Sequence, residues 1–137
     1  VADWVPALEN NSLEYEFEIP ETEYSIRIDP NAYTRILNNL FQNVIVHSTA
    51  THINLGITEN AQRAVITLCD NGRGISPEDI PHIFERMYQC DHSRSAKGNG
   101  LGLSITKELV SAHKGTIQAV SSPGIKTIFT IVLPKAL

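Results

Sequence analysis

The sequence predicts a two-layer α/β sandwich, in which one mixed, mostly antiparallel sheet of about five strands carries about three helices on a single face. Segments with strand and helix patterns mix along the chain without the strict alternation of a βαβ fold. The 137 residues suit one domain with a real core, and hydrophobic residues at 42% with charged residues at 19% are typical of a globular protein. Together these observations favour a single α/β domain.

The first elements follow from an alternating pattern and a helix-start signal. We expect residues 1–12 to be a helix or linker left from a preceding domain, and residues 13–137 to form the folded domain. Leu13–Ile19 alternates apolar and acidic side chains, which predicts a half-buried strand. Asp29 and Pro30 supply a capping acceptor and a proline suited to the first helical position, so a helix is predicted to begin there.

This helix is predicted to continue to about His47 because apolar side chains recur at spacings of three and four residues. The apolar positions are Tyr33, Ile36, Leu37, Leu40 and Val44. Asn39 and Asn43 are four residues apart on a second stripe of the helix. Their amide oxygens would suit Mg²⁺, which needs few protein ligands when phosphates and waters complete its shell. For this pair alone, the bland interpretation is a solvated helix face.

The remaining elements are predicted from apolar runs between turn residues. A short helix is predicted from Ser76 to about Phe84, and a longer one over Leu101–His113 with Lys114-Gly115 as its stop. Glu85–Asn99 is polar and glycine-punctuated, which predicts a mobile loop. The strand patterns are Leu13–Ile19, Tyr24–Ile28, His52–Thr58, Ala64–Cys69, Thr116–Val120 and Thr127–Leu133.

Composition excludes several function classes. The net charge of −4, without a basic tract, argues against a nucleic-acid surface. No stretch approaches the roughly 18 apolar residues of a membrane span. Two cysteines, Cys69 and Cys90, are far apart and lack a metal-ligand spacing, which fits a reducing cytoplasmic setting. We expect Cys69, inside an apolar strand, to be a buried thiol.

The run DNGRGI at Asp70–Ile75 ends an apolar strand and opens a glycine turn. A carboxylate at Asp70 can accept hydrogen bonds from an amino-bearing ring such as adenine, while Gly72 and Gly74 allow close approach of the backbone. An ordinary hairpin turn is the alternative, although the next segment, SPED, is predicted to begin a helix and not a returning strand. For this run alone both interpretations stay open.

A second glycine-rich run, GNGLGLSI at Gly98–Ile105, leads directly into a helix. Its backbone N–H groups and the helix dipole would suit phosphate oxygens. The run is neither a Walker A loop nor a dinucleotide fingerprint, because no Lys-Ser/Thr follows the last glycine and Leu103 occupies the third glycine position. Arg94 and Lys97 precede it closely enough to fold over phosphates. The alternatives are a glycine-rich hinge and solvated loop charges.

Taken together, four runs resemble the ATP-binding catalytic domain of bacterial sensor histidine kinases, a member of the ATPase superfamily shared with gyrase, MutL and heat-shock chaperone ATPases. The resemblance extends from about Leu13 to Leu133 and depends on the order of the four runs. The runs are RILNNLFQNVIVHS (N box), DNGRGI (first glycine box), IFERMYQCDHSRS (F box) and GNGLGLSI (second glycine box).

The resemblance implies roles for the matching residues. Asn43 would bind Mg²⁺, with Asn39 assisting near the phosphates, and Arg94 would reach the γ-phosphate from a flexible ATP lid. These three residues would carry the catalysis. Asp70 would bind the adenine amino group. The nucleotide-binding set is completed by His47, Gly72, Gly74, Ile75, Lys97, Gly98, Gly100, Leu101, Gly102 and Thr127.

Two departures from the family pattern bear on affinity. Val46 stands where the family often has a phosphate-binding lysine. Lys126 replaces the glycine of the last motif, GTxF, which is KTIF in this chain. Loss of the positive charge at Val46 would weaken ATP binding or place more weight on Arg94 and Lys97.

By resemblance, the chain binds Mg-ATP and transfers the γ-phosphoryl group to a histidine on a separate dimerisation domain of the same parent protein, which then passes phosphate to a response regulator. None of the five histidines is followed by Glu or Asp, the context of the family's acceptor, so we expect the acceptor to lie outside this chain. The isolated domain would be a cytoplasmic monomer that binds no nucleic acid, whether or not its parent is anchored in a membrane.

Three alternatives stay open. A hydrolase of the gyrase or MutL type would carry a Glu base at the position of Asn39, and an amide cannot take a proton. A non-catalytic nucleotide sensor would fit the departures at Val46 and Lys126. A serine kinase of the anti-sigma type would share the pocket and differ in its acceptor.

Overall fold

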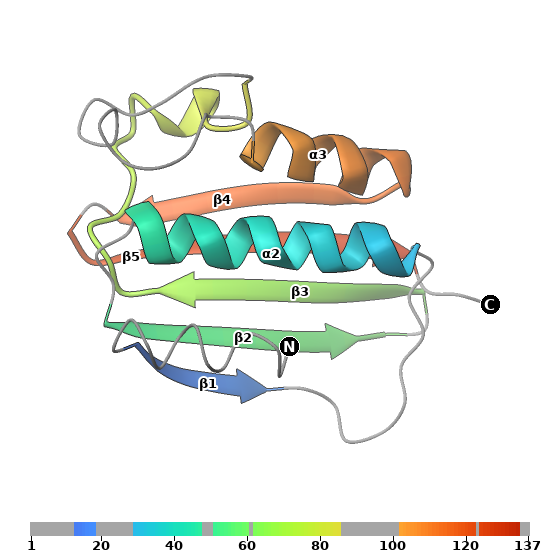
Figure 1. The fold of residues 1–137 in the computed structure, drawn as a ribbon, viewed down its shortest axis with the longest axis horizontal. Helices are drawn as coiled ribbons and strands as arrows, with labels where there is room; N and C mark the ends of the chain where they lie inside the picture. Colours follow the sequence, from blue (N-terminus) through green and yellow to red (C-terminus); the bar gives the residue numbers. More distant parts are fainter. Residues whose placement is uncertain are drawn as a thin grey trace.

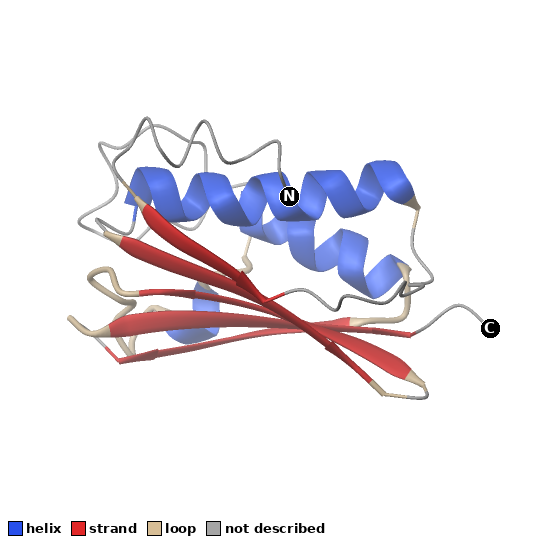
Figure 2. Ribbon diagram, turned by 90° about the horizontal axis from the view of Figure 1, so that it is seen from below, coloured by secondary structure: helices blue, strands red, loops and turns tan. Residues whose placement is uncertain are grey.

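The chain folds into two layers, a sheet and a helical layer. The computed structural model describes residues 13–18, 29–47, 51–60, 62–85, 102–122 and 124–134, without the side chains of residues 45–47. In this part of the chain one five-stranded sheet carries two α-helices on one face (Figures 1 and 2). The predicted two-layer sandwich is therefore confirmed.

The sheet has the order β1-β2-β3-β5-β4. β1 pairs with β2 in parallel, whereas the other three neighbouring pairs are antiparallel, so the predicted mixed and mostly antiparallel sheet is confirmed. The predicted strand Tyr24–Ile28 and the predicted helix or linker 1–12 lie outside the described residues. The strands are β1 (Glu14–Glu18), β2 (His52–Glu59), β3 (Arg63–Asp70), β4 (Thr116–Ser122) and β5 (Lys126–Pro134).

The helical layer contains α2 (Pro30–His47) and α3 (Gly102–Ala112), close to their predicted bounds. α2 begins as predicted, because the Asp29 carboxylate accepts a hydrogen bond of 3.0 Å from the Ala32 N–H. In the part of the chain that the structure describes, neither helix has the combination of length and hydrophobicity needed to cross a membrane.

The short helix predicted from Ser76 to about Phe84 is wrong in extent. The structure has turns there and one 3-10 turn, η2 (Ile80–His82). Pro81 lacks the N–H that would continue an α-helical ladder, which limits the segment to a single turn. The Ser76 hydroxyl donates to the Asp79 carboxylate (2.8 Å). The described helices are thus two α-helices and this turn, against about three predicted.

The core lies between the sheet and α2 with α3. Strand side chains alternate between faces, and the inward set of each central strand is buried. Each fully buried aliphatic or aromatic side chain contributes about 1.5–3 kcal/mol, so this core is the main stabilising feature. Its largest members are Ile36, Leu40, Phe41, Val44, Ile53, Leu55, Ile66, Leu68, Phe129, Ile131 and Leu133.

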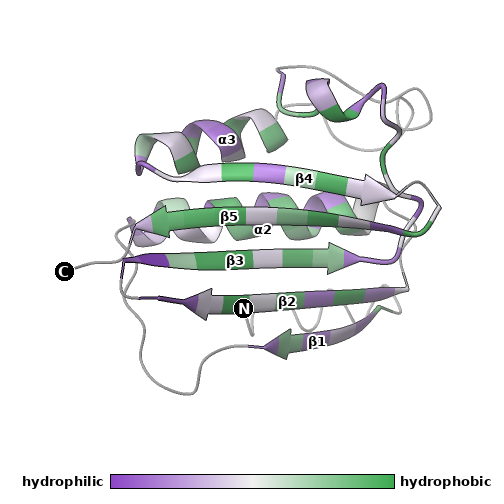
Figure 3. Ribbon diagram, turned by 180° about the vertical axis from the view of Figure 1, so that it is seen from behind, coloured by the Kyte–Doolittle hydropathy of each residue, from purple (hydrophilic) through white to green (hydrophobic). Residues whose placement is uncertain are grey.

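The other face of the sheet carries no described helix (Figure 3). Cys69 lies on this open face and is half-buried, so the prediction of a buried thiol is wrong. The reason is alternation, because its neighbours Leu68 and Asp70 both point to the helical side.

α3 ends in a hydrogen-bonded motif formed by Lys114 and Gly115. The Gly115 N–H bonds to the Val110 carbonyl (2.9 Å) and the Lys114 N–H to the Ser111 carbonyl (3.0 Å), the two bonds of a Schellman motif. Lys114 takes the left-handed position with φ 63°. Gly115 is required for space, because a Cβ there would lie 2.5 Å from the Val132 carbonyl oxygen and 2.7 Å from a Leu133 methyl carbon.

A histidine ties the end of α3 to the start of α2. His113 Nδ1 lies 2.7 Å from the Leu109 carbonyl, and its Nε2 accepts a hydrogen bond of 3.2 Å from the Asp29 N–H. A carbonyl only accepts and an N–H only donates, so in this arrangement Nδ1 is the donor of the ring and Nε2 the acceptor. His113 therefore closes one end of the helical layer.

We expect Lys114→Gly to stabilise the fold by about 0.5–1 kcal/mol, because glycine adopts a positive φ without the steric cost of a Cβ. Gly115→Ala is expected to destabilise it by at least about 2 kcal/mol, through the clash with β5. Urea unfolding of both variants measures the difference. Equal stability of the two variants would contradict the assignment of the two positions.

Candidate functional site

The described site residues gather at one end of the sandwich, on the left in Figure 1. The second half of α2, the first turn of α3, the end of β3 and the start of β5 all lie there (Figures 1 and 2). Register places Asp70 of β3 opposite Thr127 of β5, and Thr127 opposite Ser121 of β4. Three polar side chains thus form one row on the helix-facing side of the sheet, where the preceding rows are apolar.

Asp70 is a buried carboxylate at the end of β3, with 3% of its surface exposed. Burial raises the pKa of this carboxyl, and the hydrogen bond that Oδ1 accepts from the Gly72 N–H (2.9 Å) opposes the rise. Among the described residues no cation offsets the burial. A buried carboxylate with further acceptor capacity is a strong partner for an amino group on a ligand.

The turn after Asp70 is held on one side by Asn71. Its Oδ1 accepts hydrogen bonds from the Thr51 N–H (3.0 Å) and the His52 N–H (2.9 Å), and its Nδ2 donates to the Thr51 hydroxyl (3.0 Å). Gly74 has φ 75°, a conformation that favours glycine. The chain then enters the turns around η2 and not a strand, so the hairpin alternative for this run is wrong.

Ser121 holds the same turn from the other side. The Ser121 hydroxyl accepts a hydrogen bond from the Ile75 N–H (2.7 Å), donates to the Lys126 carbonyl (3.0 Å) and lies 3.1 Å from the Thr127 hydroxyl. The Gly124 N–H also bonds to the Arg73 carbonyl (2.6 Å). The first glycine run is therefore fastened to the β4–β5 hairpin as well as to β2.

Asn39 is linked to α3 through Thr106. The amide nitrogen of Asn39 donates to the Thr106 hydroxyl (3.2 Å), which donates to the Gly102 carbonyl (2.8 Å). Because Nδ2 is directed at Thr106, the Asn39 carbonyl oxygen is directed elsewhere. Asn43 is half-buried one turn further along the helix. Both amides are thus on the part of α2 that faces the end of the sheet.

The structure describes eight of the predicted site residues and brings them to this end of the sandwich. The side chain of His47 and five residues of the predicted lid and phosphate loop lie outside the described part, so their roles stay predictions. The described residues are Asn39, Asn43, Asp70, Gly72, Gly74, Ile75, Gly102 and Thr127. Those outside it are Arg94, Lys97, Gly98, Gly100 and Leu101.

Sequence reasoning missed three supporting residues, Asn71, Thr106 and Ser121. Each is a small polar side chain whose importance depends on a partner far along the chain. The available signal for Ser121 was alternation, because one of the two adjacent serines of β4 must face the core. No comparable signal marks Thr106, which is fully buried within α3.

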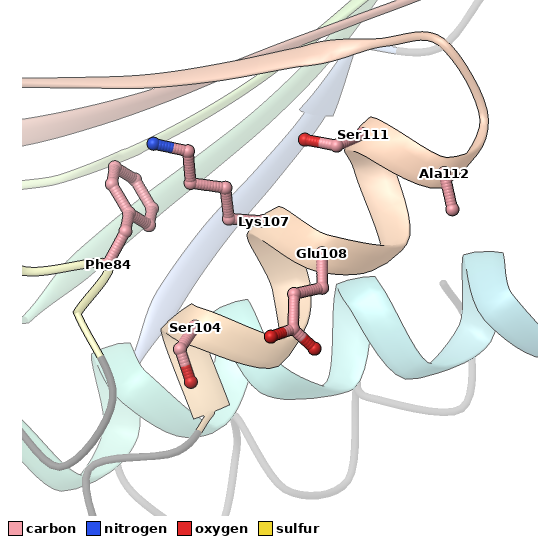
Figure 4. Close-up of a pocket in the computed structure, with 6 residues that line it drawn as sticks. All are labelled: Phe84, Ser104, Lys107, Glu108, Ser111 and Ala112. Carbon is pink, nitrogen blue, oxygen red and sulfur yellow. The ribbon is translucent and has the colours of Figure 1, made fainter.

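A separate cavity lies on the outer side of α3 (Figure 4). It has a volume of about 510 Å³, and none of the predicted nucleotide residues that the structure describes lines it. Lys107 Nζ lies 5.5 Å from the centre of the Phe84 ring, which packs edge-on against Phe129. The lining residues are Phe84, Ser104, Lys107, Glu108, Ser111 and Ala112.

Comparison with known proteins relates the sequence of this chain to ATPases and sensor kinases. A family described as histidine kinase-, DNA gyrase B-, and HSP90-like ATPase matches residues 28–137. The sensor histidine kinase YcbM of Bacillus subtilis (strain 168) is 34% identical over 98% of this chain and 44% of its own length. The sensor histidine kinase WalK of the same organism is 35% identical over 89% of this chain and 21% of its own length. This chain therefore spans less than half of either relative.

Solved structures agree with the sequence comparison. The structure of the mycobacterial sensor histidine kinase MprB has a TM-score of 0.80 and 25% identity. The match covers 95% of this chain and 91% of that chain. The catalytic domain of histidine kinase ThkA has the same fold, with a TM-score of 0.79 over 98% of this chain.

Thr106→Val is expected to lower the free energy of unfolding by about 1–3 kcal/mol, because it keeps the shape of the side chain and removes the hydroxyl that links Asn39 to Gly102. Thr106→Ser keeps the hydroxyl and is the matched control, with a loss of about 1 kcal/mol or less. Urea unfolding measures both. A valine variant as stable as the serine variant would show that these hydrogen bonds contribute nothing.

Asp70→Asn is expected to stabilise the unliganded fold at pH 7 by about 0.5–2 kcal/mol. Burial raises the pKa of Asp70 above its unfolded value, so the folded state binds this proton more tightly, and the free energy of unfolding falls as the pH rises through the folded-state pKa. The advantage of the variant should therefore be absent below the usual aspartate range and appear above it.

Urea unfolding at a series of pH values tests this trend, with Glu78→Gln as the control at an exposed acid. A difference between Asp70→Asn and the parent that does not change with pH would contradict the prediction.

Proposed function

The chain belongs to the family of histidine kinase-, DNA gyrase B-, and HSP90-like ATPases, and we propose that it binds Mg-ATP and transfers the γ-phosphoryl group to a histidine on a separate domain. The observation that carries the proposal is the buried Asp70 carboxylate. It accepts a hydrogen bond from the Gly72 N–H and lies opposite Thr127 in the sheet. A buried carboxylate suits the amino group of adenine, because an N–H of that group can supply the hydrogen bond that water would give to an exposed carboxylate.

The metal is proposed at α2. Mg²⁺ prefers oxygen ligands and usually keeps several phosphate oxygens and waters. The residues fit this preference, since the bond from Asn39 Nδ2 to Thr106 leaves an amide oxygen on Asn39, and Asn43 lies one turn further along. When bound, Mg²⁺ would neutralise charge on the phosphates. Asn43 is proposed as its ligand, with Asn39 assisting.

The phosphates are proposed to lie at the start of α3. Backbone N–H groups at a helix N-terminus attract phosphate oxygens, and Gly102 occupies that position in α3. Gly98, Gly100 and Leu101 would complete this contact, and Arg94 with Lys97 would neutralise the γ-phosphate. His47 and Ile75 would border the base.

The phosphoryl acceptor is proposed to be a histidine of a dimerisation domain in the same parent protein, with a response regulator downstream. The imidazole nitrogen would attack the γ-phosphorus, the bond to the bridging oxygen would break, and ADP would leave. Hydrolysis of the gyrase or MutL type is disfavoured, because position 39 is an amide that donates to Thr106 and cannot act as a base. The isolated domain is proposed to be a cytoplasmic monomer.

The departure at Lys126 is compatible with this proposal. The Lys126 side chain is exposed, on the side of β5 opposite to Thr127, and its backbone carbonyl accepts the hydrogen bond from Ser121. A lysine can therefore replace the family's glycine there without entering the site. Of the two departures, only Val46 then still favours a non-catalytic nucleotide sensor.

Gly102→Ala is expected to weaken Mg-ATP binding at least about tenfold while changing stability by no more than about 1 kcal/mol. A Cβ at Gly102 would meet nothing within 4 Å, so the fold tolerates it, whereas phosphates close to the backbone would not. Calorimetry with Mg-ATP and urea unfolding measure the two effects. Unchanged affinity would show that the phosphates do not bind next to Gly102.

Phosphoryl transfer to a supplied histidine domain tests the reaction itself. The chain, γ-labelled ATP, Mg²⁺ and the dimerisation domain of a related sensor kinase are expected to give an acid-labile, base-stable phosphohistidine on that domain. Asp70→Ala should abolish labelling, and Glu78→Gln should not. Binding of Mg-ATP without transfer would favour the sensor module, and release of free phosphate in place of transfer would favour a hydrolase.

A further inference from the structure

We propose that Ser121 is a positioning residue that sets the direction of the Thr127 hydroxyl and thereby makes the site prefer a purine with a 6-amino group over one with a 6-oxo group. The inference rests on the proposed binding of ATP and assigns a determinant of base selectivity to a residue outside the expected site. It follows from counting the protons around one hydroxyl.

The Ser121 hydroxyl has one proton and three neighbours. The Lys126 carbonyl, at 3.0 Å, can only accept, so it takes the Ser121 proton. The Ile75 N–H, at 2.7 Å, can only donate, so it uses one lone pair of Ser121 Oγ. The remaining lone pair is left for the third neighbour, the Thr127 hydroxyl at 3.1 Å. Thr127 is therefore the donor in that hydrogen bond.

This direction decides what Thr127 offers to a ligand. With its proton directed at Ser121, Thr127 Oγ1 presents only lone pairs to other partners. Thr127 and Asp70 are register partners on the helix-facing side of the sheet, 4% and 3% exposed. Their row thus offers two neighbouring acceptors to the base, directly or through a bridging water.

Two acceptors suit a 6-amino group and oppose a 6-oxo group. An exocyclic amino group carries two hydrogens, whereas a carbonyl oxygen at the same place would face acceptors and leave buried groups unpaired. Sites built from fixed hydrogen-bonding groups discriminate strongly for this reason. Without Ser121 Oγ, the Thr127 hydroxyl could rotate and donate to a 6-oxo group.

Ser121 also supports the turn by holding the Ile75 N–H, and this second role must be separated from the first. A loosened turn would weaken every nucleotide to a similar extent. A freed Thr127 proton would weaken the preference for the amino base. The ratio of affinities for two bases therefore distinguishes positioning of a hydroxyl from general support.

The test compares Mg-ATP with Mg-ITP, because the base of ITP has a 6-oxo group and lacks the 2-amino group of guanine. Calorimetry is performed on the parent chain, Ser121→Ala and Ser121→Thr, which keeps the hydroxyl. Ser122→Ala is the matched control, since Ser122 is the next residue of β4 and points to the opposite face. Thermal unfolding confirms that each variant is folded.

Ser121→Ala is expected to lower the ratio of ATP to ITP affinity about five- to tenfold, whereas Ser121→Thr and Ser122→Ala keep it. In a Thr127→Val background, Ser121→Ala should change the ratio no further. An equal loss of both affinities in Ser121→Ala would overturn the proposal and leave Ser121 with turn support alone.

Failure of the proposed function has a different signature, because the folded parent chain would then bind neither nucleotide. Neutron diffraction of the ligand-free protein examines the hydroxyl direction without any nucleotide. Deuterium on Thr127 Oγ1 directed at Ser121 is the expected result, and deuterium on Ser121 Oγ directed at Thr127 would overturn the inference.

Discussion

The antiparallel register between β3 and β5 is the constraint on which the candidate site depends. Apolar pairs along the two strands, such as Leu68 with Phe129 and Ile66 with Ile131, bury both members against the helices. A slip of one residue would turn all of these side chains to the open face and cost most of the core. The same register then sets Asp70 opposite Thr127 at the end of the ladder. The packing of the core thus determines which two polar side chains become neighbours at the end of the sheet.

Two hydroxyls, that of the buried Thr106 and that of the half-buried Ser121, use their protons in the same way on either side of the site. Thr106 donates to the Gly102 carbonyl, so it can only accept from Asn39. Ser121 donates to the Lys126 carbonyl, and by the same count it accepts from Thr127. Each hydroxyl therefore binds a neighbouring side chain, Asn39 or Thr127, that we propose as a ligand contact. A side chain that is already held in one orientation favours binding more than one that rotates freely, because the ligand need not order it.

The site also contains an unfavourable feature of the fold. Asp70 is a carboxylate buried without a cation among the described residues, and burial raises its pKa. Such a group persists because Asn71 binds the surrounding turn to β2 and Ser121 binds it to β4. A proposed ligand donor would satisfy the carboxylate that the fold leaves under-satisfied. This conflict between stability and binding is common at functional sites.

Much of the fold and part of the site could be predicted from local patterns. Alternation predicted β1, spacing predicted α2, and Asp29-Pro30 predicted where α2 begins, because each signal lies within a few residues of its effect. The glycine runs and the paired asparagines left several interpretations open one by one, and the resemblance to sensor kinases supplied the proposed site residues, of which the described members lie at one end of the sandwich. Where local signals competed, as with Pro81 inside the predicted helix after Ser76, the prediction was wrong in extent.

Only the tertiary structure decided the partners. Ser121 and Ser122 are identical in type and adjacent, yet the pairing of β4 with β5 brings the first to Ile75 and Thr127. Thr106 and Asn39 are 67 residues apart and meet because α2 and α3 pack on the same face of the sheet. The chain thus encodes its elements and its chemical groups locally. The direction in which each polar group donates or accepts depends on contacts between distant segments, which no local pattern contains.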